Sequence, residues 1–348
     1  MLMRIKVLLL ALLIPVLTQA QDWNRLVDLR GNWKFEIGDN MKWTEPGFDD
    51  SGWDEAFVPS SWEDEGFPGY DGFAWYRKRF TVSPEFADKT IYLLLGYIDD
   101  TDQVFLNGHF VGFSGGMPPD YLTAYQQSRE YVLPRDFLKF SGENVIAVRV
   151  YDEQLAGGIV RGQLGLFEKR NALHPAVTLA GLWRFNTGDD MDWKETNFDD
   201  SHWRQLLVPL QWETQGFEGY DGFAWYRKIF RLNKQLENEK LILLLGKIDD
   251  LDEAYLNGER IGRTGRMYRY SGRIHIQGDE WLELRAYYIP KEYLSRDGVN
   301  VIAVRVYDGL ISGGIYDGPV GIVPQKSYRE WFKKYGREHD SIWKIFDF

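Results

Sequence analysis

The sequence predicts an all-β protein of two tandem domains, each an antiparallel sandwich or barrel, and three observations carry this prediction. Short runs of β-branched and aromatic residues alternate with turns rich in Gly, Pro and Asp. Helical periodicity is confined to the C-terminal end. The stretch YDGFAWYRK occurs at residues 70–78 and recurs unchanged at 220–228. A repeat of about 150 residues has the size of a whole domain, so each copy should have its own core.

The duplication extends over most of the chain. GNWKF at residue 31 corresponds to GLWRF at 181, and LLLGYIDD at 93 corresponds to LLLGKIDD at 243, an offset of 150. VIAVRVYD at 145 recurs at 301, an offset of 156, so the second copy holds six additional residues. They fall within residues 264–286, the counterpart of 114–130. Outside this stretch the two copies align without gaps.

The first 20 residues have the pattern of a secretory signal peptide. Arg4 and Lys6 precede an apolar run over residues 7–17, and small residues stand at Thr18 and Ala20. A run this short, interrupted by proline, falls below the roughly 20 residues that a membrane span needs. We therefore expect export to the periplasm or the cell exterior after cleavage near Ala20, and no membrane span in the mature chain.

The composition excludes several classes of function. The formal charge is -11, and it becomes -13 once the two basic residues of the signal peptide are removed. A chain this acidic is a poor partner for nucleic acid, which requires a basic surface. The chain has no cysteine, which excludes thiolate catalysis and cysteine-ligated zinc, and its five histidines show no ligand spacing. The mature chain should fold without disulfides, so its stability must come from its cores.

Within a copy, the individual strands follow from local patterns. The run TIYLLLGYI at residues 90–98 is dense in aliphatic and aromatic residues. Residues 104–106 and 109–112 flank Asn107-Gly108, a pair that favours a type I′ hairpin turn. VIAVRVYD alternates with period two, as expected of a strand with one covered face. FAWYRK predicts a core strand, and the following aromatics are assigned to the core: Trp33, Phe35, Trp75 and Phe80.

The C-terminal segment differs from the rest. Tyr328, Trp331, Phe332 and Tyr335 stand at i, i+3, i+4 and i+7 after Ser327, which we expect as the N-cap. This spacing predicts an amphipathic helix at the start of the tail. The tail then docks on a sandwich, covers an edge strand or meets a partner.

The order of motifs in each copy resembles a known domain. G-x-W-[KR]-F, FDDSxW, a Pro followed by Trp-Glu, YDGFAWYRKxF, LGxIDDxD, LNG, VIAVRVYD and GGI occur in this order twice. The order is similar to that of the galactose-binding-like jelly-roll domain, which is the sugar-binding domain of family 2 glycoside hydrolases. The IDDxD and NG segments are also similar to the β-sandwich domain of sialate O-acetylesterases. The resemblance covers nearly all of residues 22–324.

This resemblance implies two tandem jelly-roll β-sandwiches plus a short C-terminal helical tail. We expect a signal peptide at 1–20, sandwiches at 21–170 and 171–324, and an amphipathic tail at 325–348. In the similar enzymes the catalytic machinery lies in a separate α/β domain, and no part of this sequence is left to encode one. The resemblance is therefore specific for the fold and much less so for function.

Two patterns are typical of hydrolases but stand in the wrong context. Ser114 lies in a G-x-S-x-G match, yet the motif follows a hairpin instead of opening a helix, and Thr264 is its counterpart. The acids at 63–65 correspond to Glu-Thr-Gln at 213–215, so the copies share only the first. A glycosidase needs two carboxylates on either side of the scissile bond. We interpret these acids as turn residues and expect no catalytic residue.

Each copy also places three aspartates at a strand end: Asp99, Asp100 and Asp102, and Asp249, Asp250 and Asp252. Ca²⁺ prefers about six to eight oxygen ligands, which clustered carboxylates can supply. Strand alternation, however, sends Asp99 and Asp100 to opposite faces. We therefore expect these acids to cap turns and pair with Arg77 or Arg149, and we expect no cofactor, with a structural calcium as the alternative.

A sugar site needs an aromatic face for the apolar side of the pyranose and polar groups for its hydroxyls. The loops between strands are the usual place for such groups. Two loops of each copy combine these residue types. The candidates are Trp62, Glu63, Tyr70, Asp71, Asp152 and Arg161 in the first copy, and Trp212, Glu213, Tyr220, Asp221, Asp308 and Asp317 in the second. The alternative is that the aromatics pack under these loops while the acids fix their turns.

Three functions remain open. The first is an exported, non-catalytic carbohydrate-binding protein that acts on a glycan beside a glycan-degrading enzyme. The second is a glycoside hydrolase or carbohydrate acetylesterase, or a subunit of one, as the family association suggests. The third is a structural or assembly module. The duplicated aromatic and acidic loops, and the lack of a stretch that could encode a catalytic domain, favour carbohydrate binding.

Overall fold

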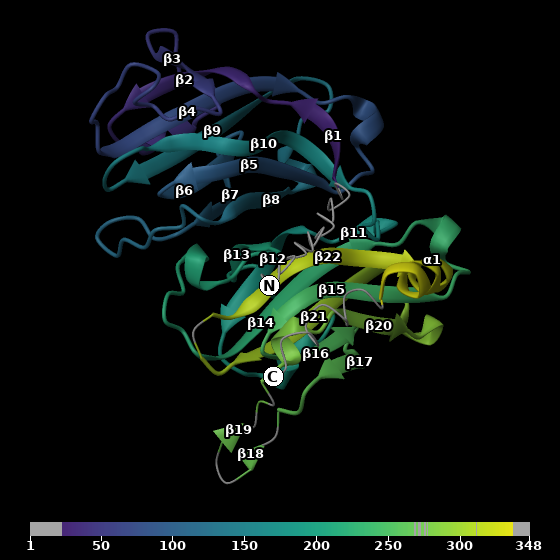
Figure 1. Ribbon diagram of the computed structural model, residues 1–348. Helices are drawn as coiled ribbons and strands as arrows, with labels where there is room; N and C mark the ends of the chain where they lie inside the picture. The colour runs from purple at the N-terminus through teal and green to yellow at the C-terminus, as the bar shows by residue number, and fades with distance from the viewer. Residues whose placement is uncertain are drawn as a thin grey trace, which may run out of the picture.

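The computed structural model describes residues 23–267, 269–270, 273–274, 276, 278–310 and 312–336. The strands form two antiparallel β-sandwiches that follow one another along the chain, and a short helix follows the second (Figure 1). The first contains strands β1–β10 and the second contains the main strands of β11–β22. The predicted fold class, all-β with two tandem sandwiches and a short C-terminal helix, is therefore confirmed. The expected signal peptide lies outside the described residues.

In the first sandwich a six-stranded sheet faces a four-stranded sheet. The larger sheet has the order β3 (Asp54–Val58), β2 (Gly31–Ile37), β4 (Gly72–Thr81), β9 (Glu143–Asp152), β6 (Thr101–Leu106) and β7 (His109–Ser114). The smaller sheet has the order β1 (Trp23–Asp28), β10 (Gly158–Lys169), β5 (Ile91–Asp99) and β8 (Ser128–Leu133).

The second sandwich repeats this topology strand for strand. Its larger sheet has the order β13 (Arg204–Val208), β12 (Gly181–Thr187), β14 (Gly222–Arg231), β21 (Val299–Asp308), β16 (Leu251–Leu256) and β17 (Glu259–Thr264). Its smaller sheet has the order β11 (Val177–Thr178), β22 (Gly314–Pro324), β15 (Leu241–Asp249) and β20 (Arg285–Ile289). The stretch with the six additional residues contains a separate hairpin, β18 (Arg269–Tyr270) and β19 (Arg273–Ile274).

Alternation of side chains along the strands fills the core between the two sheets. In β9, Ile146, Val148 and Val150 are buried in the core, whereas Arg149 and Tyr151 point to the other face. The aromatics predicted for the first core at 33, 35 and 80 lie in the same cluster. The second sandwich has an equivalent core of its own, as the duplication predicted.

The outer face of the larger sheet carries a second, smaller aromatic cluster. Trp75 is buried as predicted, but it packs there with Trp53 and Phe105, next to Trp43.

Short helical turns lie in the loops: η1 (Met41–Thr44), η2 (Pro84–Phe86), η3 (Arg135–Phe137), η4 (Met191–Lys194), η5 (Glu213–Gln215), η6 (Lys234–Leu236), η7 (Glu280–Leu282) and η8 (Lys291–Tyr293).

The predicted hairpin is present. Asn107 and Gly108 join β6 to β7 with positive φ angles of 51° and 86°, and Leu106 pairs with His109 across the turn. Positive φ at both central residues defines the type I′ turn, which Asn-Gly favours. The dipeptide alone was therefore enough to place this connection.

The C-terminal helix α1 (Gln325–Trp331) is followed by one wide turn, η9 (Phe332–Gly336). Tyr328 and Trp331 pack against a buried cluster of the second sandwich, so the described part of the tail docks on that domain. The predicted N-cap is wrong, because the helix begins two residues before Ser327 and Pro324 occupies the cap position. Residues 337–348 lie outside the described residues.

The two sandwiches contact each other. Leu207 of β13 is buried against the core cluster of the first sandwich, and Leu210 packs beside it. Strand β8 lies on the side of the first sandwich that faces the second (Figure 1). This contact positions the cleft described below.

Candidate functional site

The two loop tryptophans that we expected to offer a face to a sugar are buried. Trp62 and Trp212 are both 0% exposed. The loop containing Gly157 closes over Trp62 so tightly that a β-carbon on this glycine would lie 2.1 Å from the indole Cζ2, and Gly313 covers Trp212 in the same way. The prediction of a stacking surface is therefore wrong for these two residues, because the loops pack onto the rings.

Other candidates in these loops hold the loop backbone. The Tyr70 hydroxyl donates to the carbonyl oxygen of Phe73 at 2.6 Å and accepts the backbone N–H of Gly38 at 3.3 Å. The Glu63 carboxylate accepts the backbone N–H of Gly157 at 3.2 Å. The second copy repeats both arrangements with Tyr220 and Glu213. These contacts fit the structural alternative for the loops.

Arg161 and Asp317 were expected in a loop, but they lie in strands β10 and β22, at equivalent positions with different contacts. Arg161 is exposed, and its guanidinium carbon lies 3.8 Å from the centroid of the Tyr97 ring. Asp317 forms an ion pair with Lys247 at 3.3 Å. The two sandwiches therefore differ in charge at this position.

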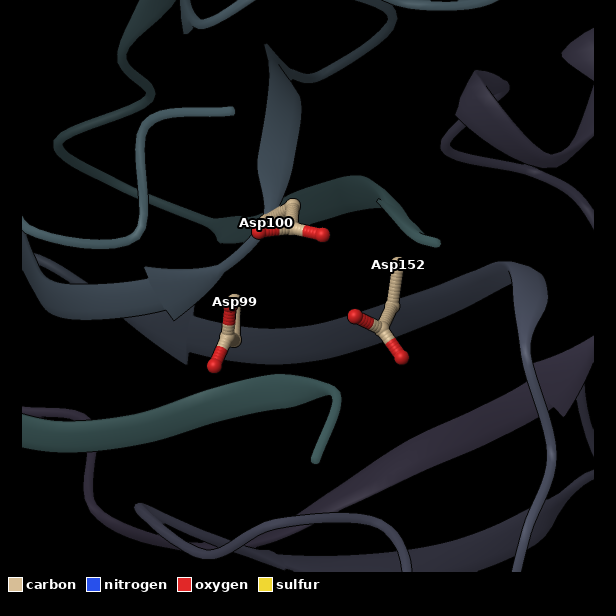
Figure 2. Close-up of side chains that lie close together, drawn as sticks. All are labelled: Asp99, Asp100 and Asp152. Carbon is tan, nitrogen blue, oxygen red and sulfur yellow. The ribbon is translucent and has the colours of Figure 1, made fainter. Parts of the chain in front are cut away.

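Three carboxylates meet where the strands β5 and β9 end. Asp99 is the last residue of β5, Asp100 connects β5 to β6, and Asp152 is the last residue of β9 (Figure 2). One carboxylate oxygen of each lies within 4.8 Å of the other two. The expectation that Asp99 and Asp100 diverge is wrong, because Asp100 lies outside the strand and alternation does not apply to it. We call this group the first acid triad, and the second acid triad is Asp249, Asp250 and Asp308.

Burial makes both acid triads electrostatically unfavourable when they are fully ionised. Asp152 is 0% exposed, and neither of its carboxylate oxygens has a hydrogen-bond partner among the described residues. Burial, followed by the charges of Asp100 and Asp99, raises the pKa of Asp152 to about 8. Burial likewise raises the pKa of Asp308 to about 7 and that of Asp249 to about 8.

Asp100 is oriented by three donors. The Tyr121 hydroxyl donates to it at 2.6 Å, the Thr123 hydroxyl at 2.5 Å and the backbone N–H of Glu153 at 3.2 Å. Burial opposes ionisation of Asp100, but these donors lower its pKa below the ordinary value. Sequence analysis missed both side chains, because they lie in the stretch where the two copies differ.

More acids surround each acid triad. The negative charge of Asp71, which is exposed, adds to the raised pKa of Asp152, and Glu63 acts on Asp99 in the same sense. Glu213 and Asp221 are the corresponding neighbours of the second acid triad. In both sandwiches, neighbouring acids therefore add to the cost of ionising the acid triad.

Asp102 does not join the first acid triad. It is buried and pairs with Arg129 of the opposite sheet, at 2.7 Å between Nε and Oδ1, with both side chains closed to solvent. Asp252 and Arg285 form the same pair in the second sandwich at 2.8 Å. These residues connect the two sheets of their sandwich.

The expected partners of the strand-end aspartates are wrong. Arg77 pairs with Asp50 at 2.8 Å, and Arg149 pairs with Asp39. Both arginines lie on the outer face of the larger sheet, where the loop over residues 38–53 reaches them, whereas Asp102 points into the sandwich. The sequence placed these arginines and Asp102 on neighbouring strands, but it did not show that they lie on opposite faces of the sheet.

A cleft of about 360 Å³ lies between the two sandwiches. The first sandwich contributes Tyr92, Glu130 and Lys169, and the second contributes Tyr316 and Asp317. Ligand sites occur preferentially at domain interfaces of this kind. Of these residues, sequence analysis had identified only Asp317, because spacing within one copy gives no signal for a surface formed by two.

The charged groups of the cleft lie close to its aromatic rings. The Lys169 ammonium is 4.8 Å from the centroid of the Tyr92 ring and 4.0 Å from the Glu130 carboxylate. Burial, followed by the negative charges of Asp317 and Glu130, raises the pKa of Tyr92. Two carboxylates, an ammonium and a phenol therefore face one space.

Ser114 also lines this cleft, at the end of β7. Its hydroxyl lies 2.9 Å from that of Tyr131, which donates its own proton to Asp102 at 2.5 Å. Ser114 therefore donates to the Tyr131 oxygen, and Thr264 forms the same contact with Tyr287 in the second copy. The hydroxyl belongs to a hydrogen-bonded chain that both copies share.

Part of the first copy is similar in sequence to proteins named as glycosidases. Residues 38–156 match the family model described as "Beta-galactosidase second all-beta domain". A β-galactosidase of Bacteroides ovatus is 30% identical over 137 residues, which cover 35% of this chain and 15% of that protein. A putative β-glucuronidase of Formosa agariphila is 32% identical over 141 residues, which cover 37% of this chain and 12% of that protein. The chain thus spans a small fraction of the length of these relatives.

Two solved structures of β-glucuronidases align with this chain at low TM-scores. A β-glucuronidase of Bacteroides uniformis aligns with a TM-score of 0.36 at 19% identity, over 73% of this chain and 26% of that chain. A Ruminococcus gnavus β-glucuronidase aligns with a TM-score of 0.35 at 12% identity, over 83% and 43% of the two chains. The expected resemblance to a β-sandwich domain of family 2 glycoside hydrolases is confirmed by the family match over residues 38–156. Among the described residues, no helix has the length and apolar character required to cross a membrane.

Proposed function

We propose that this chain is an exported, non-catalytic carbohydrate-binding protein that acts beside glycan-degrading enzymes, with its site in the cleft between the sandwiches. The cleft is the observation that carries this proposal. It combines the groups that recognise a sugar, since phenol rings offer apolar contact and carboxylates accept hydrogen bonds from hydroxyls. The similar proteins named β-galactosidase and β-glucuronidase act on glycans, which supports a glycan as the ligand class.

The volume of the cleft and the placement of its charges suit a short oligosaccharide segment. Glu130 and Asp317 belong to different sandwiches, so a ligand between them would contact both domains. Lys169, between Glu130 and the Tyr92 ring, would accommodate an acidic sugar as well as a neutral one. Binding at this place would fix the two sandwiches relative to each other.

The proposal is tested by a glycan array followed by titration calorimetry of the best ligand. We expect Asp317→Asn and Glu130→Gln to lower the affinity about tenfold or more, because each removes a charged acceptor from the cleft. Asp71→Asn and Asp221→Asn are the matched controls, since they remove exposed loop acids outside the cleft. Circular dichroism checks that all four variants are folded.

Each outcome separates the hypotheses. Loss of binding in the loop variants alone would move the site to the loops that the sequence suggested. Absence of glycan binding by the intact chain would contradict the proposal and favour an assembly role. Release of reducing ends from a bound glycan would instead indicate a glycoside hydrolase.

A further inference from the structure

We propose that each sandwich binds one Ca²⁺ ion, the first through Asp99, Asp100 and Asp152 and the second through Asp249, Asp250 and Asp308. This inference goes beyond carbohydrate binding and does not depend on it. It differs from the aspartate set that the sequence suggested, because Asp102 and Asp252 already have arginine partners. The strand-end residues Asp152 and Asp308 take their place.

The buried carboxylate of Asp152 carries the argument. A carboxylate closed to solvent normally has an arginine, a lysine or several donors as partners, because burying an uncompensated charge costs several kcal/mol or more. Asp152 is 0% exposed, both of its oxygens lack a hydrogen-bond partner among the described residues, and it faces two further carboxylates (Figure 2). A cation between the three side chains would supply the missing compensation.

Asp308 repeats this feature in the second sandwich. It is 0% exposed, and its Oδ2 has no partner among the described residues, while its Oδ1 accepts the backbone N–H of Leu310 at 3.1 Å. The two acid triads are 150 to 156 residues apart in the sequence, in separate cores. The same unusual group therefore occurs twice in independent surroundings.

No described side chain neutralises the negative charge of the acid triads through an ion pair. None of the six triad aspartates forms an ion pair with a described residue. The cation that acts on Asp99 is Arg129, and its guanidinium already binds the Asp102 carboxylate and the carbonyl oxygens of Ile98 and Asp100. The net charge of the first acid triad and its surroundings thus remains negative.

The oxygen separations and the ligand type suit calcium. Two oxygens on opposite sides of Ca²⁺, at about 2.4 Å from the ion, are about 4.8 Å apart, whereas the corresponding separation around Mg²⁺ is about 4.2 Å. The triad oxygens lie within 4.8 Å of one another, so one Ca²⁺ ion can contact all three carboxylates. Calcium also accepts carboxylates in one-oxygen or two-oxygen mode and completes its shell with water. The absence of histidine from both acid triads disfavours zinc.

In the first acid triad, one carboxylate is held in place by hydrogen bonds and another is open to the approach of an ion from solvent. Three donors hold Asp100 in place, which reduces the side-chain entropy lost on binding. Each carboxylate oxygen can accept more than one contact, so these donors leave capacity for a metal ion. Asp99 is only half-buried and gives the ion a path from solvent.

The duplication provides an internal control for the experiment. The full chain, stripped with EDTA and freed of chelator, is titrated with CaCl₂ near pH 8 by calorimetry and by equilibrium dialysis with ⁴⁵Ca²⁺. We expect two ions per chain for the wild type, with affinity in the range of about 10⁻⁵ to 10⁻³ M. Asp152→Asn and Asp308→Asn should each bind one ion, and the double variant should bind none. Asp71→Asn, an exposed acid beside the first acid triad, should still bind two.

Thermal unfolding gives a second readout. Calcium should raise the Tm of the wild type more than equal concentrations of MgCl₂ or matched NaCl, and the gain should disappear in the double variant. If Asp152→Asn fails to fold, Asp99→Asn tests the same site. Absence of Ca²⁺ binding by the wild type at about 10 mM, or two ions retained by the double variant, would overturn the proposal, and three carboxyls sharing protons would then explain the acid triads.

Discussion

The Arg129–Asp102 pair joins the two sheets of the first sandwich through a contact that is closed to solvent. Arg129 uses its guanidinium fully: it donates to the Asp102 carboxylate and to the carbonyl oxygens of Ile98, Asp100, Ala124 and Gln127. One side chain thus fixes the β5–β6 corner, the loop before β8 and the opposite sheet. Buried charged residues stabilise the fold only when all their partners are present, because a buried charge without its partner lowers the stability.

We predict that Arg129→Ala lowers the free energy of unfolding by about 3–5 kcal/mol, because it leaves the Asp102 carboxylate buried without a cation. Urea denaturation followed by tryptophan fluorescence measures this change. The double variant Arg129→Ala with Asp102→Ala should lose less than the sum of the two single losses, since it removes both charges. Additive losses would show that the pair is not coupled.

A second residue-scale prediction concerns acid stability. Burial opposes ionisation of Asp50, but hydrogen bonds from Arg77 and Arg79 outweigh it and lower the pKa of this carboxyl below the ordinary value of 3.8. A group with a lowered folded-state pKa contributes stability above the unfolded-state pKa and loses it as the pH falls through the folded-state value. The free energy of unfolding should therefore decrease as the pH is lowered below about 4.

Asp50→Asn isolates this contribution. The variant should be less stable than the wild type near neutral pH, and the difference should shrink as the pH falls below about 4, where the wild-type carboxyl becomes protonated. Urea midpoints across this range provide the measurement. A constant difference at all pH values would contradict the assignment.

Sequence analysis identified the aspartates of both strand ends but not their roles. Asp99, Asp100, Asp102 and Asp152 are the same residue type near strand ends, and one becomes an inter-sheet ion pair while three form an acid triad. The difference comes from β8, whose pairing with β5 brings Arg129 to Asp102. Such a partner is set by sheet packing, which local patterns do not encode.

At the scale of elements, local patterns were sufficient where a short stretch decides its own conformation. The Asn-Gly turn and the alternating run of β9 follow from two to eight residues, and both are present. The loop tryptophans were misjudged because their burial depends on a second loop. Trp62 is covered by the glycine pair at 157–158, which is nearly a hundred positions away in the chain.

This loop contact supports a prediction. Gly157→Ala would place a β-carbon 2.1 Å from Cζ2 and 2.3 Å from Cε2 of Trp62. The ring is fully buried and cannot give way, so we expect a loss of about 1–3 kcal/mol or more in the free energy of unfolding. Gly47→Ala is the matched control, because an added β-carbon there meets no atom within 4 Å. Equal stability of the two variants would contradict the packing described for this loop.

At the scale of the whole molecule, the sequence predicted two domains but gave no information on how they meet. The cleft depends on the contact of β13 with the first sandwich. The repeat in the sequence does not predict this contact, because equivalent positions in the two copies have different surroundings. Phe57 and Leu207 occupy the same place in the two copies. Phe57 is 52% exposed, whereas Leu207 is 5% exposed and packs against the first core cluster. The asymmetry of the pair therefore arises from assembly and not from the repeat itself.

These equivalent positions allow a matched test of the domain contact. Leu207→Asp would place a charge against apolar residues of the first sandwich, so we expect the contact to open and the radius of gyration in small-angle scattering to increase. Each sandwich has its own core, so circular dichroism should still show two folded domains. Phe57→Asp introduces the same charge at the equivalent exposed position and should leave the radius unchanged. An unchanged radius in Leu207→Asp would contradict the prediction and show that Leu207 does not hold the two sandwiches together.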